Sequence, residues 1–199
     1  MQNPQKAKED YFDHWAASYD AFYTAWLYRW CHARLLARVH LQASHVLDLG
    51  CGTGCLLRLL AKRFGDLRGV GLDLSERMVS QACQRNHAAR LSFVQGNAEV
   101  LPFAAAQFDA VFSTFSFQHY LHPEQVVQEV RRVLRPGGYF YWVDTSVGER
   151  TGHRTIAMTP GGLRLYSPES RHKLGIDAGL VCISHHSLLG PVLLSTFVG

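Results

Sequence analysis

The chain has 199 residues, 47% hydrophobic and 18% charged, with a formal net charge of +4 at pH 7. This length and apolar content suit one globular domain with a sizeable core. Lys and Arg alternate with acidic residues and form no basic block, so we expect no nucleic-acid partner. No apolar run reaches the ~18 residues of a membrane span, and the polar first ten residues lack the apolar stretch of a secretory signal, which predicts a cytoplasmic protein.

An aromatic-rich segment opens the chain, with nine Phe, Trp and Tyr residues before position 31. The pattern predicts two helices there, and we expect residues 1–42 to form a lid on a core made of residues 43–199 of the same domain. The rings can pack on the core and over a bound ligand. Alternatively, part of the patch receives an apolar substrate or touches a membrane surface.

From residue 45 onward, strand-like apolar runs alternate with helix-like segments, which predicts a parallel sheet flanked by helices. The predicted strands are 45–50, 68–75, 91–98, 108–116 and 139–146, followed by two strands within 181–199 that meet at Gly190-Pro191. The predicted helices are 55–65, 75–86, 122–138 and 167–180. Ending on two such strands is unlike a dinucleotide fold, which ends on another crossover.

The second half of the chain also has a predicted helix end and an insertion that concern the arginines and the substrate site. We expect the helix over 122–138 to carry Arg131, Arg132 and Arg135 in its last turn and to end at Pro136-Gly137-Gly138. The glycine-rich insertion 147–167 is the one sizeable segment available to shape a substrate site, and we expect it to be mobile.

The stretch "HVLDLGCGTGCLLRLL", residues 45–60, places a glycine-rich loop between the first strand and the first helix of the sheet. Such a loop lies at the carboxyl end of its strand, where doubly wound sheets bind ligands. Its glycines, Gly50, Gly52 and Gly54, do not have the G-x-G-x-x-G spacing of a pyrophosphate loop, and no Gly-Lys-Ser/Thr of a Walker loop follows. Asp48, two residues before the first glycine, would repel a phosphate but can pair with an ammonium group.

A second acid, Asp73, stands at the end of the second strand, about 20 residues beyond the loop. From that position a carboxylate can accept both hydroxyls of an adenosine ribose. An adenosine combined with an amino-acid ammonium points to S-adenosylmethionine as the ligand.

The sequence resembles the class I S-adenosylmethionine-dependent methyltransferases in several motifs that follow one another in the family's order. "VLDLGCGTG" resembles the first motif, "GVGLDLS" the second acidic strand end, "GNAEVLPF" the adenine segment, "FDAVFSTFSFQHY" the fourth strand and "RVLRPGG" the helix end before the fifth strand. The likeness extends from Val46 to Gly138 and is closest to the small ubiquinone/menaquinone C-methyltransferase-like group. It implies an α/β fold: a Rossmann-like, doubly wound, seven-stranded sheet with the last strand antiparallel, helices on both faces and an N-terminal helical lid.

The resemblance also implies the contacts of the cofactor, S-adenosyl-L-methionine. The expected cofactor-binding residues are Tyr19, Asp48, Gly50, Cys51, Gly52, Gly54, Asp73, Leu74, Asn97, Ala98, Glu99 and Ser113. Tyr11 is a further lid candidate beside Tyr19. Family members often have Asp-Ala where this chain has Asn97-Ala98; Asn97 can still bond to adenine, or it can be a turn residue after the third strand.

The chemistry of methyl transfer requires alignment of the acceptor with an activated donor, and a base is optional. His119 and Tyr120, just past the fourth strand, are the candidate catalytic residues. His119 would be a general base if its pKa stays near ~6.5. In the alternative interpretation both side chains pack under the lid or cap the next helix.

We expect no metal site. Cys51 with Cys55, and His119 with His122, lack further ligands at useful spacing. His185 and His186 are neighbours in a predicted strand and point to opposite faces.

The sequence predicts a methyltransferase for a small, hydrophobic or aromatic molecule and leaves the acceptor and the oligomeric state undetermined. The alternatives are a non-catalytic S-adenosylmethionine-binding or sensing protein and, if the loop spacing is ignored, a nicotinamide-dependent oxidoreductase.

Overall fold

A computed structural model describes residues 3–16, 22–39, 41, 45–148 and 152–199, and the side chains of residues 22–25 are not included. Of the residues predicted from the sequence to bind the cofactor, Tyr19 lies outside the described residues.

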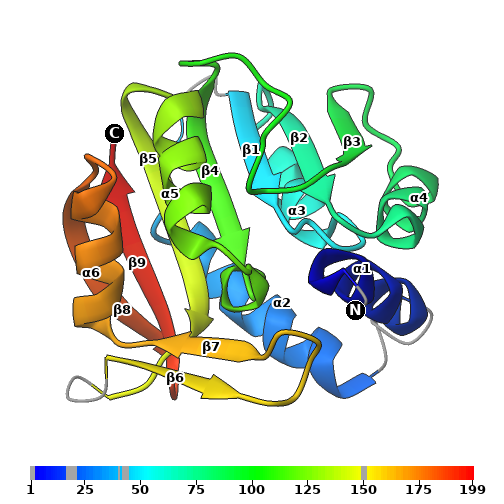
Figure 1. The fold of residues 1–199 in the computed structure, drawn as a ribbon. Coiled ribbons are helices and arrows are strands. Elements are labelled where there is room, and N and C mark those ends of the chain that lie inside the picture. The colour runs from blue at the N-terminus through cyan, green and yellow to red at the C-terminus, as the bar shows by residue number, and fades with distance from the viewer. Residues whose placement is uncertain (1–2, 17–21, 40, 42–44, 149–151) are drawn as a thin grey trace.

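One seven-stranded sheet organises the chain, in the order β3-β2-β1-β4-β5-β9-β8 (Figure 1). Its strands are β1 (His45–Leu49), β2 (Arg68–Asp73), β3 (Leu91–Gln95), β4 (Phe108–Thr114), β5 (Leu134–Thr145), β8 (Val181–Leu189) and β9 (Val192–Val198). The first five pair in parallel, whereas β9 is antiparallel to both of its neighbours, β5 and β8. The predicted sheet with an antiparallel last strand is confirmed.

Helices cover both faces of the sheet, as predicted. Buried side chains of α2 (Phe22–Leu36), α3 (Cys55–Arg63) and α4 (Glu76–Gln84) join the core on one face. The valines of α5 (Pro123–Val133) and Leu174 of α6 (Pro168–Asp177) join the core on the other face. The apolar positions at helical spacing therefore place each helix on its side of the sheet.

Helix α5 ends earlier than predicted. It stops at Val133, and Leu134 already has extended backbone and pairs with Phe108 of β4. Pro136 accounts for this, because it drives the preceding Arg135 out of the helical region and its ring would clash with the carbonyl group of Arg132 in a continued helix. Arg135 consequently lies in β5 rather than in the last helical turn, and it forms an ion pair with Asp109 at 2.6 Å.

Three elements gather where β1 and β4 end, at the lower edge of the sheet in Figure 1. They are α1 (Pro4–Trp15), the 3₁₀ turn η1 (Phe117–His119) and a hairpin of β6 (His153–Ile156) and β7 (Leu163–Tyr166). The hairpin occupies the insertion that we expected to be mobile, so this segment has regular antiparallel structure; its mobility stays a prediction. The two N-terminal helices lie in different places. Helix α1 lies at this edge, whereas α2 packs on the sheet through buried Cys31 and Leu35.

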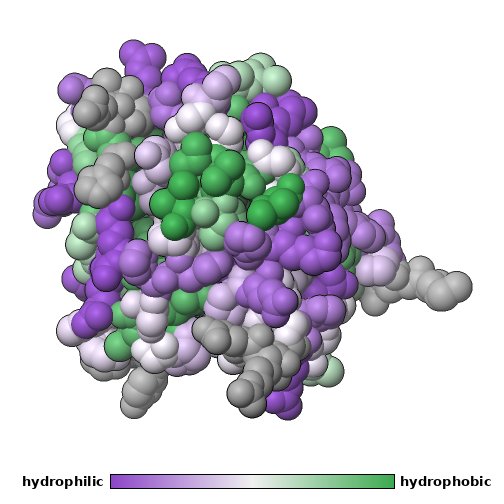
Figure 2. Space-filling model, turned by 90° about the vertical axis from the view of Figure 1, so that its left-hand side faces the viewer, coloured by the Kyte–Doolittle hydropathy of each residue, from purple (hydrophilic) through white to green (hydrophobic). Residues whose placement is uncertain are grey.

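Edge strand β8, with α6 beside it, forms the side of the molecule opposite α1 and α4 (Figure 1). That side presents an apolar area ringed by hydrophilic residues (Figure 2). Exposed apolar side chains of these two elements are Ile176, Val181 and Ile183. None of the helices in the described parts of the chain is long and apolar enough to cross a membrane.

Candidate cofactor and active site

The glycine loop that follows β1 turns sharply before α3. Gly50, Gly52 and Gly54 all have positive φ angles, between 51° and 76°, where glycine is favoured over other residues. A Cβ on Gly50 would also lie 2.3 Å from the Cβ of Ser116, so this position excludes any side chain. The bare backbone of the loop therefore lies directly against the side chain of Ser116, in the turn after β4.

A first cavity opens between this loop, the ends of β2 and β3, and α1. Its empty volume, counted out to the open mouth, is about 770 Å³. It is lined by Gln5, Lys8, Phe12, Trp15, Gly50, Gly52, Leu72, Asp73, Leu74, Met78, Gly96, Asn97, Ala98, Glu99, Phe115, Ser116, His119, Tyr120 and Leu121. A mainly apolar lining with a few polar groups is typical of a small-molecule site.

Asp73 is one of two carboxylate residues that line this first cavity, the other being Glu99. Its Oδ2 accepts the Gly52 N–H at 2.8 Å and its Oδ1 accepts the Ser75 N–H at 2.9 Å. Burial raises the pKa of Asp73 to about 6, although these backbone hydrogen bonds lower it. The side chain is therefore fixed at the glycine loop, and each oxygen keeps a lone pair for a ligand hydroxyl.

The turn after β3 forms the neighbouring wall. Asn97 Oδ1 accepts the Glu99 N–H at 2.9 Å, which is the turn role considered from the sequence, and Asn97 also lines the cavity. Glu99 Oε1 accepts the His122 N–H at 3.1 Å and so connects this turn to the start of α5.

A second cavity, with an empty volume of about 600 Å³ counted in the same way, lies on the other side of the glycine loop, against α2. Asp48 and His32 both line it, and both are buried. Burial, and then Asp73, raise the pKa of Asp48 well above its usual range, and Asp48 Oδ1 has no hydrogen-bond partner among the described residues. A buried, unpaired carboxyl oxygen costs about 1–3 kcal/mol and suits a cationic ligand.

Phe115 and Gly50 line both cavities and mark where they meet. Phe115 has a φ of 57°, a conformation that non-glycine residues rarely adopt, and its ring lies 4.5 Å from the ring of Tyr28 on α2. Such strain costs roughly 1–3 kcal/mol and is common at functional sites. The strained residue places the end of β4 between the two cavities.

His119 and Tyr120 both line the first cavity. Burial, and then Lys8, lower the pKa of His119 to about 3, and its ring meets the ring of Phe12 edge to face at 5.0 Å. The imidazole is therefore neutral at pH 7 but far more weakly basic than the sequence-based hypothesis assumed. The Tyr120 hydroxyl donates to Ser116 Oγ at 3.3 Å, and burial raises the pKa of Tyr120 well above its usual value.

Lys8 of α1 is a site residue that the sequence did not reveal. Its side chain is 4% exposed, lines the first cavity and donates to the carbonyl oxygen of His119. Burial, and then repulsion by Arg164 of β7, lower the pKa of Lys8 to about 8. Sequence reasoning missed Lys8 because it stands among polar residues of a helix that looks solvent-exposed.

Nine of the predicted cofactor-binding residues line a cavity. Asp48 and Cys51 line the second, Gly50 lines both, and Gly52, Asp73, Leu74, Asn97, Ala98 and Glu99 line the first. Gly54 and Ser113 line neither. Gly54 begins α3 and faces the ring of Phe93, while Ser113 lies behind Ser116, with the two hydroxyls 2.7 Å apart.

Comparison with known proteins agrees with this geometry. The family model described as "Methyltransferase domain" matches residues 47–142, from β1 to β5. The chain belongs to the class I S-adenosylmethionine-dependent methyltransferases. Methyl transfer from S-adenosylmethionine defines this family, and the two buried carboxyls beside the glycine loop fit such a donor. The narrower likeness to ubiquinone C-methyltransferases stays a prediction.

Two curated relatives and one solved structure are similar to this chain. "Probable phthiotriol/phenolphthiotriol dimycocerosates methyltransferase 2" of Mycobacterium ulcerans is 34% identical over 72% of the chain and 64% of its own length. "Fatty-acid O-methyltransferase" of Mycolicibacterium smegmatis is 40% identical over 54% of the chain and 39% of its own length. The chain therefore spans less than two thirds of either relative.

The solved structure is the complex between the Haloferax volcanii Trm112 methyltransferase activator and a methyltransferase. The likeness covers 94% of this chain and 96% of that one, with a TM-score of 0.81 and 26% identity. The agreement includes the N-terminal and C-terminal parts that the family model leaves out.

Proposed function

We propose that this chain transfers the methyl group of S-adenosylmethionine to a carboxylate oxygen of a molecule with an apolar chain. The donor's adenosine would occupy the first cavity, with the ribose hydroxyls on Asp73 and the base beside Asn97 and Ala98. Its ammonium would pair with Asp48 in the second cavity. Gly50 and Phe115, which line both cavities, would hold the part between them.

Lys8 is the observation that carries the acceptor assignment. A buried ammonium next to apolar Phe12 and Leu121 offers a charge for an anionic group and a wall for a hydrocarbon chain. Arg164 adds a second positive charge close by, since it lowers the pKa of Lys8, while Glu99 of the same cavity raises that pKa to a smaller extent. The name of the fatty-acid O-methyltransferase relative agrees with this substrate class.

With a carboxylate as the acceptor, the residues of the chain only have to align the two reactants and exclude water. Bound S-adenosylmethionine supplies an already activated methyl group. A carboxylate is ionised at neutral pH, so no residue has to remove a proton from it, and the low pKa of His119 is no obstacle. Lys8 would orient one carboxylate oxygen so that the other faces the methyl group, and α1 would exclude water.

The test is methyl transfer from S-adenosylmethionine carrying a trideuterated methyl group to carboxylic acids of increasing chain length. We expect a labelled methyl ester, measured by mass spectrometry, with kcat/KM rising with chain length. The corresponding alcohols and amides should not react. Labelling of the alcohols in preference to the acids would contradict the proposed acceptor, and S-adenosylhomocysteine binding without turnover of any acceptor class would favour the non-catalytic alternative.

A further inference from the structure

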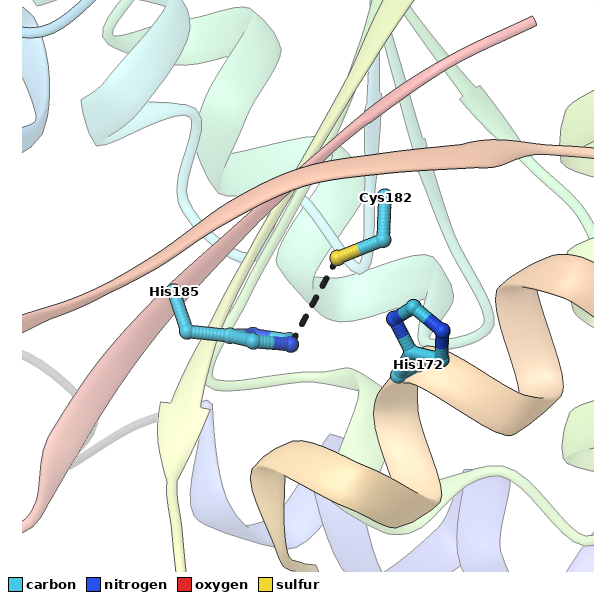
Figure 3. Close-up of side chains that lie close together, drawn as sticks. All are labelled: His172, Cys182 and His185. Carbon is cyan, nitrogen blue, oxygen red and sulfur yellow. Dashed lines mark hydrogen bonds between the residues drawn. The ribbon is translucent and has the colours of Figure 1, made fainter.

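A cluster of three metal-binding side chains lies outside the methyltransferase site, on the side of the sheet formed by α6 and β8. It consists of His172 of α6 with Cys182 and His185 of β8, and the ligand atoms of all three lie within 4.8 Å of one another. Figure 3 shows the three side chains turned toward one common space. In the described part of the chain, no other group of three or more His, Cys, Asp and Glu side chains is arranged in this way.

A bulge in β8 explains how Cys182 and His185 share a face. Residues three apart in a regular strand point to opposite sides of the sheet. Here Cys182 pairs with Phe197 and Ser184 with Thr196, so Ile183 is an extra residue, and the side chains after it change face. The bulge brings both ligands toward α6, whereas the sequence pattern alone separates them.

The spacing suits zinc. Zinc bonds of about 2.3 Å to sulfur and 2.0–2.1 Å to nitrogen, in tetrahedral geometry, place the two ligand atoms roughly 3.5 Å apart. Cys182 Sγ and His185 Nε2 are 3.5 Å apart. His172 is exposed on its helix, so its side chain can turn to complete the set.

The other ring nitrogen of His185 also has a hydrogen-bond partner. Its Nδ1 lies 2.9 Å from the hydroxyl oxygen of buried Ser195, which also accepts from Arg171 at 3.4 Å. Metal-bound histidines typically donate their other ring N–H to such a partner. With Nδ1–H directed at Ser195, an assigned tautomer, the Nε2 lone pair faces Cys182 and the shared space.

We propose that His172, Cys182 and His185 bind one Zn²⁺ ion, which links α6 to edge strand β8. Two imidazoles and a thiolate form the ligand set, and water fills the fourth position. Binding replaces the S–H bond of Cys182 by an S–Zn bond and releases that proton to solvent.

The test titrates the metal-free, full-length chain with Co²⁺ and then with Zn²⁺. We expect one Co²⁺ per chain, with a thiolate-to-cobalt charge-transfer band and the visible bands of tetrahedral cobalt, all removed by one equivalent of Zn²⁺. Cys182→Ser should abolish the charge-transfer band, and His172→Ala should weaken Zn²⁺ binding at least tenfold. Zinc should raise the Tm of the wild type but not that of Cys182→Ser.

Matched controls keep the result specific. Cys83→Ser removes an exposed thiol on α4, and His186→Ala removes the exposed neighbour of His185. Both should bind metal like the wild type. All variants should keep wild-type S-adenosylhomocysteine affinity, which reports that they are folded. If Cys182→Ser does not fold, His172→Ala decides. Absence of the band in the wild type, or unchanged binding in the His172 variant, would overturn the proposal.

Discussion

Asp48 lies one residue before the end of β1, and Asp73 is the last residue of the neighbouring strand β2. Burial raises the pKa of both, yet they differ in their surroundings. Asp73 already accepts two backbone N–H groups, whereas Oδ1 of Asp48 accepts none from the described residues. The carboxylate of Asp73 is fixed by these hydrogen bonds and keeps lone pairs that can accept from neutral hydroxyls. The unpaired, buried carboxyl of Asp48 is better suited to a cation. Under the proposed function, Asp73 would therefore bind the ribose end of S-adenosylmethionine and Asp48 its ammonium end.

The pKa values of Lys8 and His119 predict how the reaction rate depends on pH. Because the pKa of Lys8 is about 8, its ammonium is lost above that pH and an anionic acceptor binds less well. We predict that kcat/KM for an acid acceptor falls above about pH 8. It should not fall between pH 7 and 5 through His119, whose pKa is about 3.

Lys8→Met should raise KM for the acid at least tenfold and remove the alkaline fall, with unchanged S-adenosylhomocysteine affinity. Lys6→Met, on the exposed side of α1, is the control. A rate that falls with a pKa near 6.5, and that His119→Ala lowers about a hundredfold, would restore His119 as the base instead.

At the level of elements, α1 is held to the core at one end. Asp13 Oδ1 accepts from the hydroxyl of Ser75 at 2.5 Å, and the Gln81 side chain donates to the carbonyl oxygen of Ala16 at 2.9 Å. Ser75 is the N-cap of α4 and also donates its N–H to Asp73. Ser75 thus forms hydrogen bonds both with α1 and with the acid that would hold the ribose.

Helix α6 gives a prediction about packing. A Cβ added to Gly175 would lie 2.4 Å from Cε1 of Phe197 on β9, so Gly175→Ala must push α6 away from the sheet. We expect a loss of roughly 1–3 kcal/mol in the free energy of unfolding, measured by urea denaturation.

Gly65→Ala is the matched control, because a Cβ there would meet nothing within 4 Å. S-adenosylhomocysteine affinity should stay unchanged in both variants. Equal stability of the two would show that α6 is not tightly packed on Phe197.

The sequence predicted the strands and most helices because their apolar periodicity is local. It could not predict the end of α5 to the residue, since a helical pattern and a proline compete there. Lys8 is buried by a contact 111 residues away, and His172 meets Cys182 through a helix–strand contact and a bulge. Such features depend on tertiary contacts that carry no periodic signal. Asp48, Gly50 and Asp73 were predictable because strand ends fix their place.

For the whole molecule, buried histidines connect stability to pH. Burial lowers the pKa of His32 to about 4, while an unfolded histidine titrates near ~6.5. Its contribution to stability is therefore complete above pH 6.5 and is lost as the pH falls toward 4. Burial raises the pKa of Asp144 to about 7 and that of Asp73 to about 6, so their contribution has the opposite sign and is lost as the pH rises through those values.

Comparing the free energy of unfolding of the wild type with that of His32→Gln separates the effect of His32 from that of these acids. The advantage of the wild type over His32→Gln in free energy of unfolding should shrink by about 2 kcal/mol from pH 7 to pH 5. Urea denaturation at the two pH values measures it. A constant difference would mean that His32 takes up its proton in the folded state as readily as in the unfolded chain.

The central claim, an S-adenosylmethionine pocket centred on Asp73, is tested most directly by calorimetry with S-adenosylhomocysteine. We predict a Kd in the micromolar range or tighter, about −8 kcal/mol, for the wild type and for the exposed-acid control Asp66→Asn. Asp73→Asn loses the charge and keeps an acceptor oxygen for only one of the two backbone N–H groups, so its Tm should fall by a few degrees while the protein stays folded. Its affinity should fall at least tenfold, since hydrogen bonds to a charged group contribute roughly 1.5–3 kcal/mol each. Binding of NADH but not of S-adenosylhomocysteine, or an Asp73→Asn variant with wild-type affinity, would contradict the account.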